Sequence, residues 1–356
     1  MLVISFLSFR NYNEDDFKSQ IKPKPSEELK GFLPLKDFND TNLSKSERIF
    51  FIESSGVKLG SSDIGDLKER ASCSIESAAL LNPDSIIYVI FVSRIKLNIS
   101  ETVKSIMNYK NVELCRINLR DFIQGSIAES WIESDKLYDS SFLGNNISNF
   151  LRLFLLLKYG GTYLDTDVIS KASINSIEEN NFIGVESFDE QHNTSLINNA
   201  IMRFESMSIG HELVEKFLSE FMTNYNGHAW AWNGPHLVTQ VINKFCDLPR
   251  KPINEKYNCS GVTILPTKMC SEISFREIGV LFSEDSSVYE KTLERIKDSS
   301  LVHLFNRMSQ GHKVRTNSKT AIIEMAKQYC PIVLSNSVLQ ASFLQLFQQI
   351  LRKNVQ

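Results

Sequence analysis

The sequence predicts an α/β domain with a mixed, mostly parallel, Rossmann-like sheet flanked by helices. Segments typical of strands and helices alternate between residues 48 and 119. Residues 85–93, "SIIYVIFVS", form a continuous β-branched run of the kind found in central parallel strands. The 356 residues are 42% hydrophobic and 23% charged, which is enough apolar material for one large core.

The first half of the predicted domain follows a repeated strand–helix order. The apolar run "RIFFIES" suits a buried strand, Asn82-Pro83 ends the first helix, and Ser100 is a suitable N-cap for the second. These patterns predict strands at 48–54, 85–93 and 111–119 and helices at 69–82 and 100–110. Such an order is typical of βαβ units and therefore of a parallel sheet.

The second half contains a helix that is apolar on nearly all sides, residues 148–159, which predicts that it is buried. Gly160 and Gly161 then supply a glycine C-cap, and "TYLDTDVIS", residues 162–170, reads as one strand. Later patterns predict helices at 210–225, 234–246 and 318–330 and short strands at 262–266 and 301–305.

The ends of the chain differ in character from this domain. Residues 1–9, "MLVISFLSF", are apolar but too short to cross a bilayer. Residues 10–46 are polar and contain several prolines, which predicts a stem or linker. The folded domain is expected at 47–331, followed by a helical tail at 332–356. A net charge of −3 makes nucleic acid a poor partner.

The six cysteines include no CxxC pair, so a structural zinc site is not expected. An even number suits secretory disulfides, although it also suits buried thiols. Cys246 and Cys259 flank a loop and are the first choice for a bridge. Six N-x-S/T triplets lend mild support to a lumenal, glycosylated protein, and they begin at Asn39, Asn42, Asn98, Asn146, Asn193 and Asn258.

Asp165 and Asp167 are the pair of residues that most strongly indicates a site. Two carboxylates so close together repel each other and gain from sharing a hard divalent cation such as magnesium or manganese. Such an ion commonly takes its remaining ligands from substrate phosphates. A solvated pair at a strand end is the simpler alternative, but apolar residues on both sides favour the rim of a buried sheet.

Two classes of enzyme use an aspartate pair at the end of a strand. One is the haloacid-dehalogenase type of phosphatase, whose strand-D-x-D pattern "YLDTDV" matches superficially. That class also needs a downstream lysine and a downstream acidic pair, and no convincing "GDxxxD" follows residue 167. The other class is the sugar-nucleotide glycosyltransferases.

From about Ile49 to Cys330 the chain resembles the α1,4-glycosyltransferases related to lactosylceramide 4-α-galactosyltransferase and to the α1,4-N-acetylglucosaminyltransferases. The blocks that carry this resemblance are "IFFIES", "CSIESAALLNPDS", "SNFLRLFLLLKYGGTYLDTDVI", "NNAIMRF", "WAWNGPHLVTQVINKFC", "GVTILP", "VHLFNRMSQG" and "YCP". Several blocks in the same order are far more specific than D-x-D alone.

The resemblance implies a GT-A fold and a retaining, α1,4-forming transfer from a UDP-sugar, with manganese or magnesium as cofactor. Galactose is the first expected donor sugar and N-acetylgalactosamine the second, with a galactose-type acceptor on a glycosphingolipid. It also implies a Golgi membrane protein with a lumenal catalytic domain, so residues 1–9 would be the remnant of an anchor. No oligomeric state is predicted. A non-catalytic sugar-binding relative remains an alternative.

The same resemblance suggests roles for individual residues. The expected metal ligands are Asp165, Asp167 and His303, and the expected catalytic residues are Asp165, Asp167 and Arg152. Donor-binding residues would be Asn149, Arg152, Gly161, Tyr163, Asp165, Asn306, Gln310 and Gly311. Acceptor-binding residues would be Glu186, Trp232, Gly234 and Pro235.

Several of these residues also have ordinary structural explanations. Arg152, in an apolar helix, needs a partner and would otherwise form an internal ion pair. His303 in an apolar strand and the tryptophans near 230 could be core residues. Asn149 stands where the family usually has the acid of Asp-x-x-Arg, so it could mark a different donor sugar or a weakened site.

Overall fold

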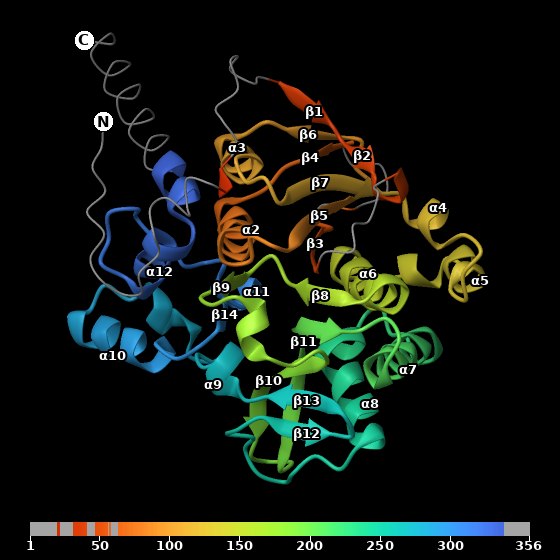
Figure 1. Ribbon diagram of the computed structural model, residues 1–356. Coiled ribbons are helices and arrows are strands. Elements are labelled where there is room, and N and C mark those ends of the chain that lie inside the picture. Colours follow the sequence, from red (N-terminus) through yellow and green to blue (C-terminus); the bar gives the residue numbers. More distant parts are fainter. Residues whose placement is uncertain (1–19, 22–30, 41–46, 56, 58–62, 338–356) are drawn as a thin grey trace.

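The computed structural model describes residues 20–21, 31–40, 47–55, 57 and 63–337. Within these residues, nine strands form one mixed sheet in the order β12-β13-β10-β11-β8-β3-β5-β7-β2 (Figure 1). Helices cover both of its faces, so the mixed, mostly parallel sheet flanked by helices is confirmed. The predictions for residues 1–9 and for the tail beyond Ser337 lie outside the described residues.

The parallel half of the sheet contains the strands that the sequence predicts most directly. Strand β3 lies between β5 and β8 and is parallel to both, and β5 is also parallel to β7. The bounds of these strands are β3 Arg48–Glu53, β5 Ile86–Val92, β7 Val112–Ile117 and β8 Gly161–Leu164. All three strands predicted before residue 120 are therefore confirmed.

The other half is mainly antiparallel and was only partly predicted. The hairpin of β10 (Phe182–Asp189) and β11 (Thr194–Phe204) is antiparallel and pairs through β11 with β8. Strand β13 (Val262–Leu265) is a predicted strand, and β12 (Tyr257–Cys259) forms the edge. The hairpin was missed because polar residues such as Asn198 and Asn199 interrupt its apolar pattern.

Five main helices form the layers on the sheet (Figure 1). Helices α2 and α3 lie against one face, while α6, α7 and α8 lie against the other. Ser100 caps α3 as predicted, because its Oγ accepts from the N–H of Val103. Their bounds are α2 Glu69–Leu81, α3 Glu101–Met107, α6 Leu143–Tyr159, α7 Ile209–Thr223 and α8 Leu237–Phe245.

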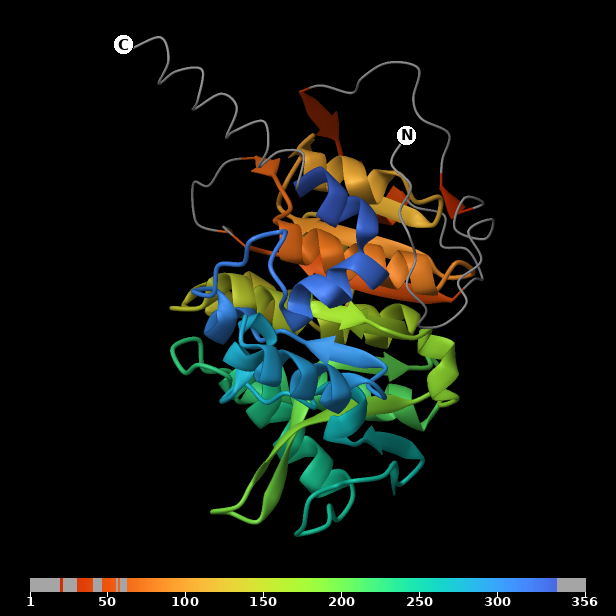
Figure 2. The same cartoon turned by 90° about the vertical axis from the view of Figure 1, so that its left-hand side faces the viewer.

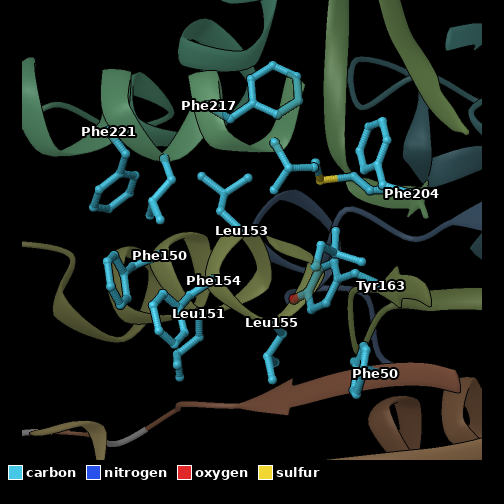
Figure 3. Close-up of a cluster of buried hydrophobic side chains, with 14 of the residues drawn as sticks. Phe50, Phe150, Leu151, Leu153, Phe154, Leu155, Tyr163, Phe204, Phe217 and Phe221 are labelled. Carbon is cyan, nitrogen blue, oxygen red and sulfur yellow. The ribbon is translucent and has the colours of Figure 1, made fainter. Parts of the chain in front are cut away.

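Alternate residues of β3 enter the two cores on opposite faces of the sheet, as strand geometry requires. Phe50 packs with the side chains of α6, whereas Ile49 packs with those of α2. Figure 3 shows the first core, in which Tyr163 of β8 lies among apolar side chains of α6 and near Phe50. Helix α6 is buried on most sides, as its sequence predicts.

The predicted strand at 162–170 is in fact two strands in two sheets. It breaks after Leu164, and β9 (Val168–Ser170) pairs instead with β14 (Leu301–His303) in a separate two-stranded sheet. The amide N–H of Val168 donates to the carbonyl oxygen of Asp165, which closes the turn between them. The two aspartates therefore lie in a turn and not within a strand, which frees their side chains from the alternation of the sheet.

Part of the predicted linker belongs to the folded domain. Residues 31–40 form β1 (Phe32–Pro34), β2 (Lys36–Asp37) and a 3₁₀ turn, and β2 is the edge strand beside β7. The side chain of Phe38 is 1% exposed and packs edge-on against four aromatic rings. Leu35 is also buried, so this part of the predicted linker contributes to both cores.

The C-terminal segment from η5 to α12 packs beside α2, at the front of the view in Figure 2. It has a small core of its own, and a disulfide between Cys73 and Cys330 joins it to α2. The bounds here are η5 Ile278–Phe282, α10 Ser286–Ile296, α11 Asn306–Ser309 and α12 Ala321–Tyr329.

The short elements that remain connect these layers. They are β4 Ile64–Gly65, β6 Lys96–Asn98, η1 Phe38–Asp40, α4 Leu119–Ile123, α5 Glu129–Glu133, η2 Lys136–Tyr138, η3 Ile174–Ile177, η4 Trp232–His236 and α9 Thr267–Cys270. In the described part of the chain, none of the helices is both long and apolar enough to span a bilayer.

The predicted bridge between Cys246 and Cys259 is present. Of the described cysteines, Cys115 and Cys270 are free and buried. One predicted glycosylation triplet is inaccessible: Asn146 is 4% exposed, and its side-chain oxygen accepts from Asn233. That triplet is a structural feature of the core, because its amide is needed for internal hydrogen bonds.

Candidate active site

The turn between β8 and β9 lies at the carboxyl end of β8, the edge where α/β sheets usually bind ligands. One ligand atom from each of Asp165, Asp167 and His303 lies within 4.8 Å of the other two. The structure thus brings together the three residues that the sequence analysis names as metal ligands. Strand β14 carries His303 to this turn because β14 pairs with β9.

Asp165 is held by two side chains of the buried core. Its Oδ1 lies 3.0 Å from Nη2 of Arg152, and the hydroxyl of Tyr163 donates to the same oxygen. Burial is the main reason that the pKa of Tyr163 lies well above its usual value, so this hydroxyl stays a donor. The carboxylate is consequently fixed in orientation while remaining partly open to solvent.

Arg152 uses its hydrogen-bond donors mostly on protein groups. It is 4% exposed, and it donates to the carbonyl oxygen and hydroxyl of Ser148 and, at 2.7 Å, to the carbonyl oxygen of Asn199. Its guanidinium also lies 4.4 Å from the ring centre of Tyr163. In this arrangement Arg152 forms an internal ion pair that positions Asp165, the ordinary role considered for it above.

Asp167 is 8% exposed and lies between two donors. Nε2 of His303 is 3.2 Å from its Oδ1, and the backbone N–H of Asn306 donates to its Oδ2 at 2.7 Å. Burial by itself would raise the pKa of Asp167, but the charge and hydrogen bond of His303 and the Asn306 N–H outweigh it and lower the pKa. The carboxylate therefore stays ionised inside the protein.

His303 has a defined orientation because both of its ring nitrogens have neighbours. Nδ1 lies 3.1 Å from Nδ2 of Asn198, and the N–H of Ala200 donates to the side-chain oxygen of Asn198. Nδ1 is therefore an acceptor, which leaves the proton on Nε2, facing Asp167. Burial lowers the pKa of His303, but the negative charge of Asp167 more than offsets this and raises it.

Glu186 faces the same corner from β10. The register of the β10–β11 pair shifts between Val185 and Ser187, so Glu186 occupies a bulge, a feature that redirects a side chain. Burial raises its pKa to about 7, and the nearby charge of His303 only partly offsets this. Among the described residues no hydrogen bond or ion pair to its carboxylate occurs, so it is free to contact a ligand.

Asn149 and Gly234 lie next to each other beside Asn199. The side-chain oxygen of Asn149 accepts from the amide of Asn199 at 2.9 Å. A side chain at Gly234 would come within 3.2 Å of the Asn199 amide and 3.4 Å of the Asn149 amide. The glycine thus allows the close approach of both amides, and Pro235 follows it in a π-helical turn that precedes α8.

Other predicted residues lie away from this group. Gly161 is at the opposite end of β8, against the backbone of Arg48. The indole N–H of Trp232 donates to the carbonyl oxygen of Asn224, which turns the ring toward a separate surface hollow. Gln310 and Gly311 are exposed in the loop after α11. The structure therefore brings together the metal ligands, Asn149, Arg152, Tyr163, Glu186, Gly234 and Asn306, but not these four.

Sequence reasoning missed several residues around the site. Asn198 and Asn199 occur in the block "NNAIMRF" but were given no role, and Arg70 at the start of α2 carries no local pattern. Arg307 was also missed, although its guanidinium lies 3.8 Å from the ring centre of the exposed Trp230. A buried polar residue in a strand is a usable signal for the asparagines, whereas nothing local identifies the arginines.

The donor set fits a divalent cation. Two carboxylate oxygens and an imidazole nitrogen are ligands that manganese accepts, and magnesium would favour the oxygens. Asp165 is partly exposed, so that a ligand could approach the group from solvent on this side. With a buried arginine, a histidine and an unpaired glutamate nearby, the arrangement can hold a cation together with an anionic leaving group.

Comparison with known families identifies two adjoining regions of the chain. Residues 68–183 match the family model of a glycosyltransferase sugar-binding region containing the DXD motif. Residues 206–337 match the model of the alpha 1,4-glycosyltransferase conserved region. The first region includes Asp165 and Asp167 and the second includes His303, so the two matches meet at the site.

Characterised relatives are similar over most of the chain. It is 28% identical to mouse lactosylceramide 4-alpha-galactosyltransferase over 263 residues, which are 73% of this chain and 69% of that protein. It is 27% identical to human alpha-1,4-N-acetylglucosaminyltransferase over 270 residues, or 73% of this chain and 74% of that one.

Solved structures of glycosyltransferases are more distant. Galactosyltransferase LgtC, in complex with donor and acceptor sugar analogues, is 13% identical, with a TM-score of 0.41 over 81% of this chain and 95% of its own. The PaToxG glycosyltransferase is 17% identical, with a TM-score of 0.38 over 84% and 87%. Likenesses at this level add nothing to the assignment, which rests on the two sequence regions and on the site where they meet. The chain thus carries the DXD sugar-binding region and the α1,4-glycosyltransferase conserved region, and it is similar to α1,4-glycosyltransferases over most of its length.

Proposed function

We propose that this glycosyltransferase moves galactose from UDP-galactose to a galactose-type acceptor and forms an α1,4 bond with retention of configuration. The observation that carries the proposal is the convergence of Asp165, Asp167 and His303 at the carboxyl end of β8. In a family of sugar transferases, a cation site at this edge is best explained by a nucleotide diphosphate. The named activity of the mouse relative supports galactose as donor sugar.

The three residues would hold Mn²⁺ or Mg²⁺, which supplies positive charge to a departing diphosphate. Arg152 and Tyr163 keep Asp165 in place, and the Asn306 N–H does the same for Asp167. Because these groups are already oriented before substrate binds, little reorganisation is needed when charge develops on the leaving group. The principal contribution of the chain is therefore electrostatic and positional.

The acceptor and donor sugars would lie on the side of Glu186 and the Asn149–Asn199 pair. Glu186 has no hydrogen-bond or ion-pair partner among the residues that the structure describes, and it could accept a hydrogen bond from an acceptor hydroxyl. Asn149, whose side-chain oxygen accepts from the buried Asn199, could offer its amide N–H to the donor sugar, and Gly234 leaves room beside it. An amide can donate to a carbonyl oxygen as a carboxylate cannot, so N-acetylgalactosamine is the second donor sugar.

We further propose that the acceptor is a glycosphingolipid and that the protein works at the Golgi membrane, with its catalytic domain in the lumen. The named lipid substrate of the mouse relative supports the first point. The two disulfides between described cysteines support an oxidising compartment.

Purified protein tests the proposal directly. It is incubated with UDP-galactose and Mn²⁺, with and without lactose or lactosylceramide, and UDP release and the product linkage are measured. We expect acceptor-dependent release of UDP that chelation abolishes, with an α1,4-linked product. UDP-glucose, UDP-N-acetylglucosamine and UDP-N-acetylgalactosamine complete the donor panel.

The alternatives give different results in this assay. A phosphatase would leave UDP-galactose intact and hydrolyse a simple phosphate ester, although the two family matches do not favour it. A non-catalytic relative would bind UDP-sugar in calorimetry without turnover, which Asn149 in place of the family's usual acid would explain. If all four donors fail while the folded protein binds neither Mn²⁺ nor UDP, the proposed function is wrong.

A further inference from the structure

Arg70, the second residue of α2, makes four hydrogen bonds to a segment that is distant in the sequence. Nη1 donates to the side-chain oxygen of Asn306 at 3.2 Å and to the hydroxyl of Ser309 at 2.8 Å. Nη2 donates to the carbonyl oxygens of Ser309 at 3.1 Å and His312 at 2.9 Å. One guanidinium thus binds four acceptors that are more than 230 residues away in the sequence.

The contacted segment, Asn306–His312, begins beside the proposed metal site. It begins at the residue whose N–H donates to Asp167 at 2.7 Å. The hydroxyl of Ser309, which accepts from Arg70, also donates to the carbonyl oxygen of Leu304, one residue after His303. Arg70 is therefore connected by two short routes to the residues that orient Asp167.

Aromatic packing strengthens the same attachment. The guanidinium of Arg70 lies 4.8 Å from the ring centre of Phe282, and that ring stacks on His312 at 5.0 Å. A planar fork that both donates in its plane and stacks on its face is a property of arginine that lysine lacks. The identity of the residue, and not only its charge, is thus used here.

The charge of Arg70 has no carboxylate partner in contact. Within the described residues no Asp or Glu oxygen lies within 4.0 Å of its guanidinium, and all four of its acceptors are neutral. Burial lowers its pKa, while the negative charge of Asp167 raises it. The cation of Arg70 and the anion of Asp167 therefore interact at a distance, across the segment that separates them.

We propose that Arg70 is a positioning residue that clamps the Asn306–His312 segment onto α2, and thereby holds Asp167 ready to bind a cation. The proposal deepens the proposed function and rests on it for the identity of the ligand. Arg70 itself makes no hydrogen bond or ion pair with Asp165, Asp167 or His303. Its effect is transmitted by the Asn306 N–H and by the chain that carries His303.

Two substitutions distinguish the effect of the hydrogen bonds and stacking of Arg70 from the effect of its positive charge. Arg70→Gln removes both the charge and most of the donors, whereas Arg70→Lys keeps the charge but loses the fork and the stacking. Arg295→Gln is a matched control, because Arg295 also makes four hydrogen bonds, to Glu272 and Glu277, and none of them is to the Asn306–His312 segment.

The first measurement needs neither metal nor activity. Trypsin can cleave the segment and its continuation after Arg307, Lys313 and Arg315, and mass spectrometry follows each cut in the metal-free protein. We expect both Arg70 variants to be cut at Arg307 about tenfold faster than the wild type, with Arg295→Gln unchanged. The thermal midpoint is recorded for each variant, and Arg70→Lys decides the result if Arg70→Gln does not fold.

The second measurement is the affinity for Mn²⁺, by calorimetry, with and without UDP. Loss of an outer partner of a metal ligand commonly weakens binding about 10- to 100-fold, and both Arg70 variants should fall in this range. Faster cleavage with unchanged Mn²⁺ affinity would overturn the positioning role, as would wild-type cleavage in both variants. If the wild type itself binds no Mn²⁺, the proposed function fails, and the cleavage rates alone decide whether the clamp exists.

Discussion

Charged residues lie at both ends of strand β8, but acids and bases balance at one end and carboxylates are in excess at the other. At the glycine end, a hollow of about 450 Å³ is lined by Glu47, Arg48, Arg203 and Glu205 among others. Both terminal nitrogens of Arg203 are used there, on Glu47 and on Asn175, and Nη1 of Arg48 donates to a backbone carbonyl oxygen. Two acids and two bases line this hollow, so its charge is balanced.

At the carboxyl end of β8, three carboxylates meet with less compensation. Asp165 and Glu186 face the same corner as Asp167, with Arg152 and His303 as the nearby bases. In the described part of the chain, Glu186 is the one of these three acids without a hydrogen-bond or ion-pair partner, and a cation or a ligand here would relieve the repulsion. The comparison shows that an imbalance of charge, and not the size of a hollow, marks the candidate site.

The largest expected difference between the two ends is in catalysis. Asp167→Asn should lower the transfer rate by about 10²–10³-fold, because the site loses a charge that acts on the leaving group. Glu47→Gln removes a carboxylate from the glycine end and should change the rate by less than about twofold. UDP release under saturating donor measures both. Equal losses in the two variants would remove the functional distinction between the ends.

The loss of unfolding free energy should be larger for a substitution of Arg152, at the carboxyl end, than for one of Arg203, at the glycine end. Arg152→Gln leaves Asp165 without its ionic partner and should cost about 3 kcal/mol in the unfolding free energy of the metal-free protein. Arg203→Gln breaks a pair whose glutamate is exposed and should cost about 1 kcal/mol. Urea unfolding gives both values.

Mn²⁺ sharpens this comparison, because a bound cation would neutralise Asp165 in the absence of Arg152. Part of the loss in Arg152→Gln should therefore be recovered when Mn²⁺ is added, while Arg203→Gln should not respond. Recovery in both variants, or in neither, would contradict a cation site confined to the carboxyl end.

Metal binding should depend on pH through His303. Burial lowers the pKa of His303, but the negative charge of Asp167 outweighs burial and raises the pKa, and only the neutral imidazole can bind a cation. Mn²⁺ affinity should thus fall as pH is lowered through that raised pKa. His303→Gln should bind about 10- to 100-fold more weakly, with a flatter pH dependence. Calorimetry from pH 6 to 8 measures this, and an unchanged affinity would exclude His303 as a ligand.

The smallest expected effect concerns Glu186. Because its folded pKa of about 7 is above its unfolded value, the stability it contributes is complete below the unfolded pKa and is lost as pH rises toward 7. Glu186→Gln cannot ionise, so the fall in thermal midpoint between pH 5 and pH 8 should shrink by about 2 °C. Glu76, whose pKa burial also raises to about 7, keeps part of the dependence in both proteins.

Glu205→Gln, at the glycine end, is the control for that measurement. Glu205 is exposed and accepts hydrogen bonds from Asn180 and Asn181, so its substitution should leave the pH dependence of the midpoint unchanged. A change of the same size in both variants would show that the effect does not belong to the carboxyl end.

Sequence reasoning succeeded where a property is local. The β-branched run of β5, the apolar helix α6 and the N-cap Ser100 are each decided within a few residues. The glycine pair is also local: Gly160 and Gly161 both have positive φ, and a side chain at either would collide with backbone atoms. The prediction of one strand at 162–170 was wrong, because each half of this segment suits a strand but the chain passes from one sheet to another between them.

For the site, a family resemblance pointed to His303, whereas the spacing of residues along the chain could not. The residues around its ring are distant in sequence; Asn198, for example, is 105 residues away. The β10–β11 hairpin and the bulge at Glu186 were not predicted, because polar residues needed at the site interrupt the strand pattern. No sequence pattern around Arg70 indicates that it contacts the segment after His303.

By itself, the sequence determined the alternating elements, the aspartate pair with its preference for a cation, and the short Cys246–Cys259 bridge. Only the tertiary structure decided which distant residues surround that pair, and it also made the bridge between Cys73 and Cys330, 257 residues apart. The physical reason is one of range. Backbone preference and periodicity act over a few residues, whereas charge compensation and packing act between whatever surfaces the finished fold brings together.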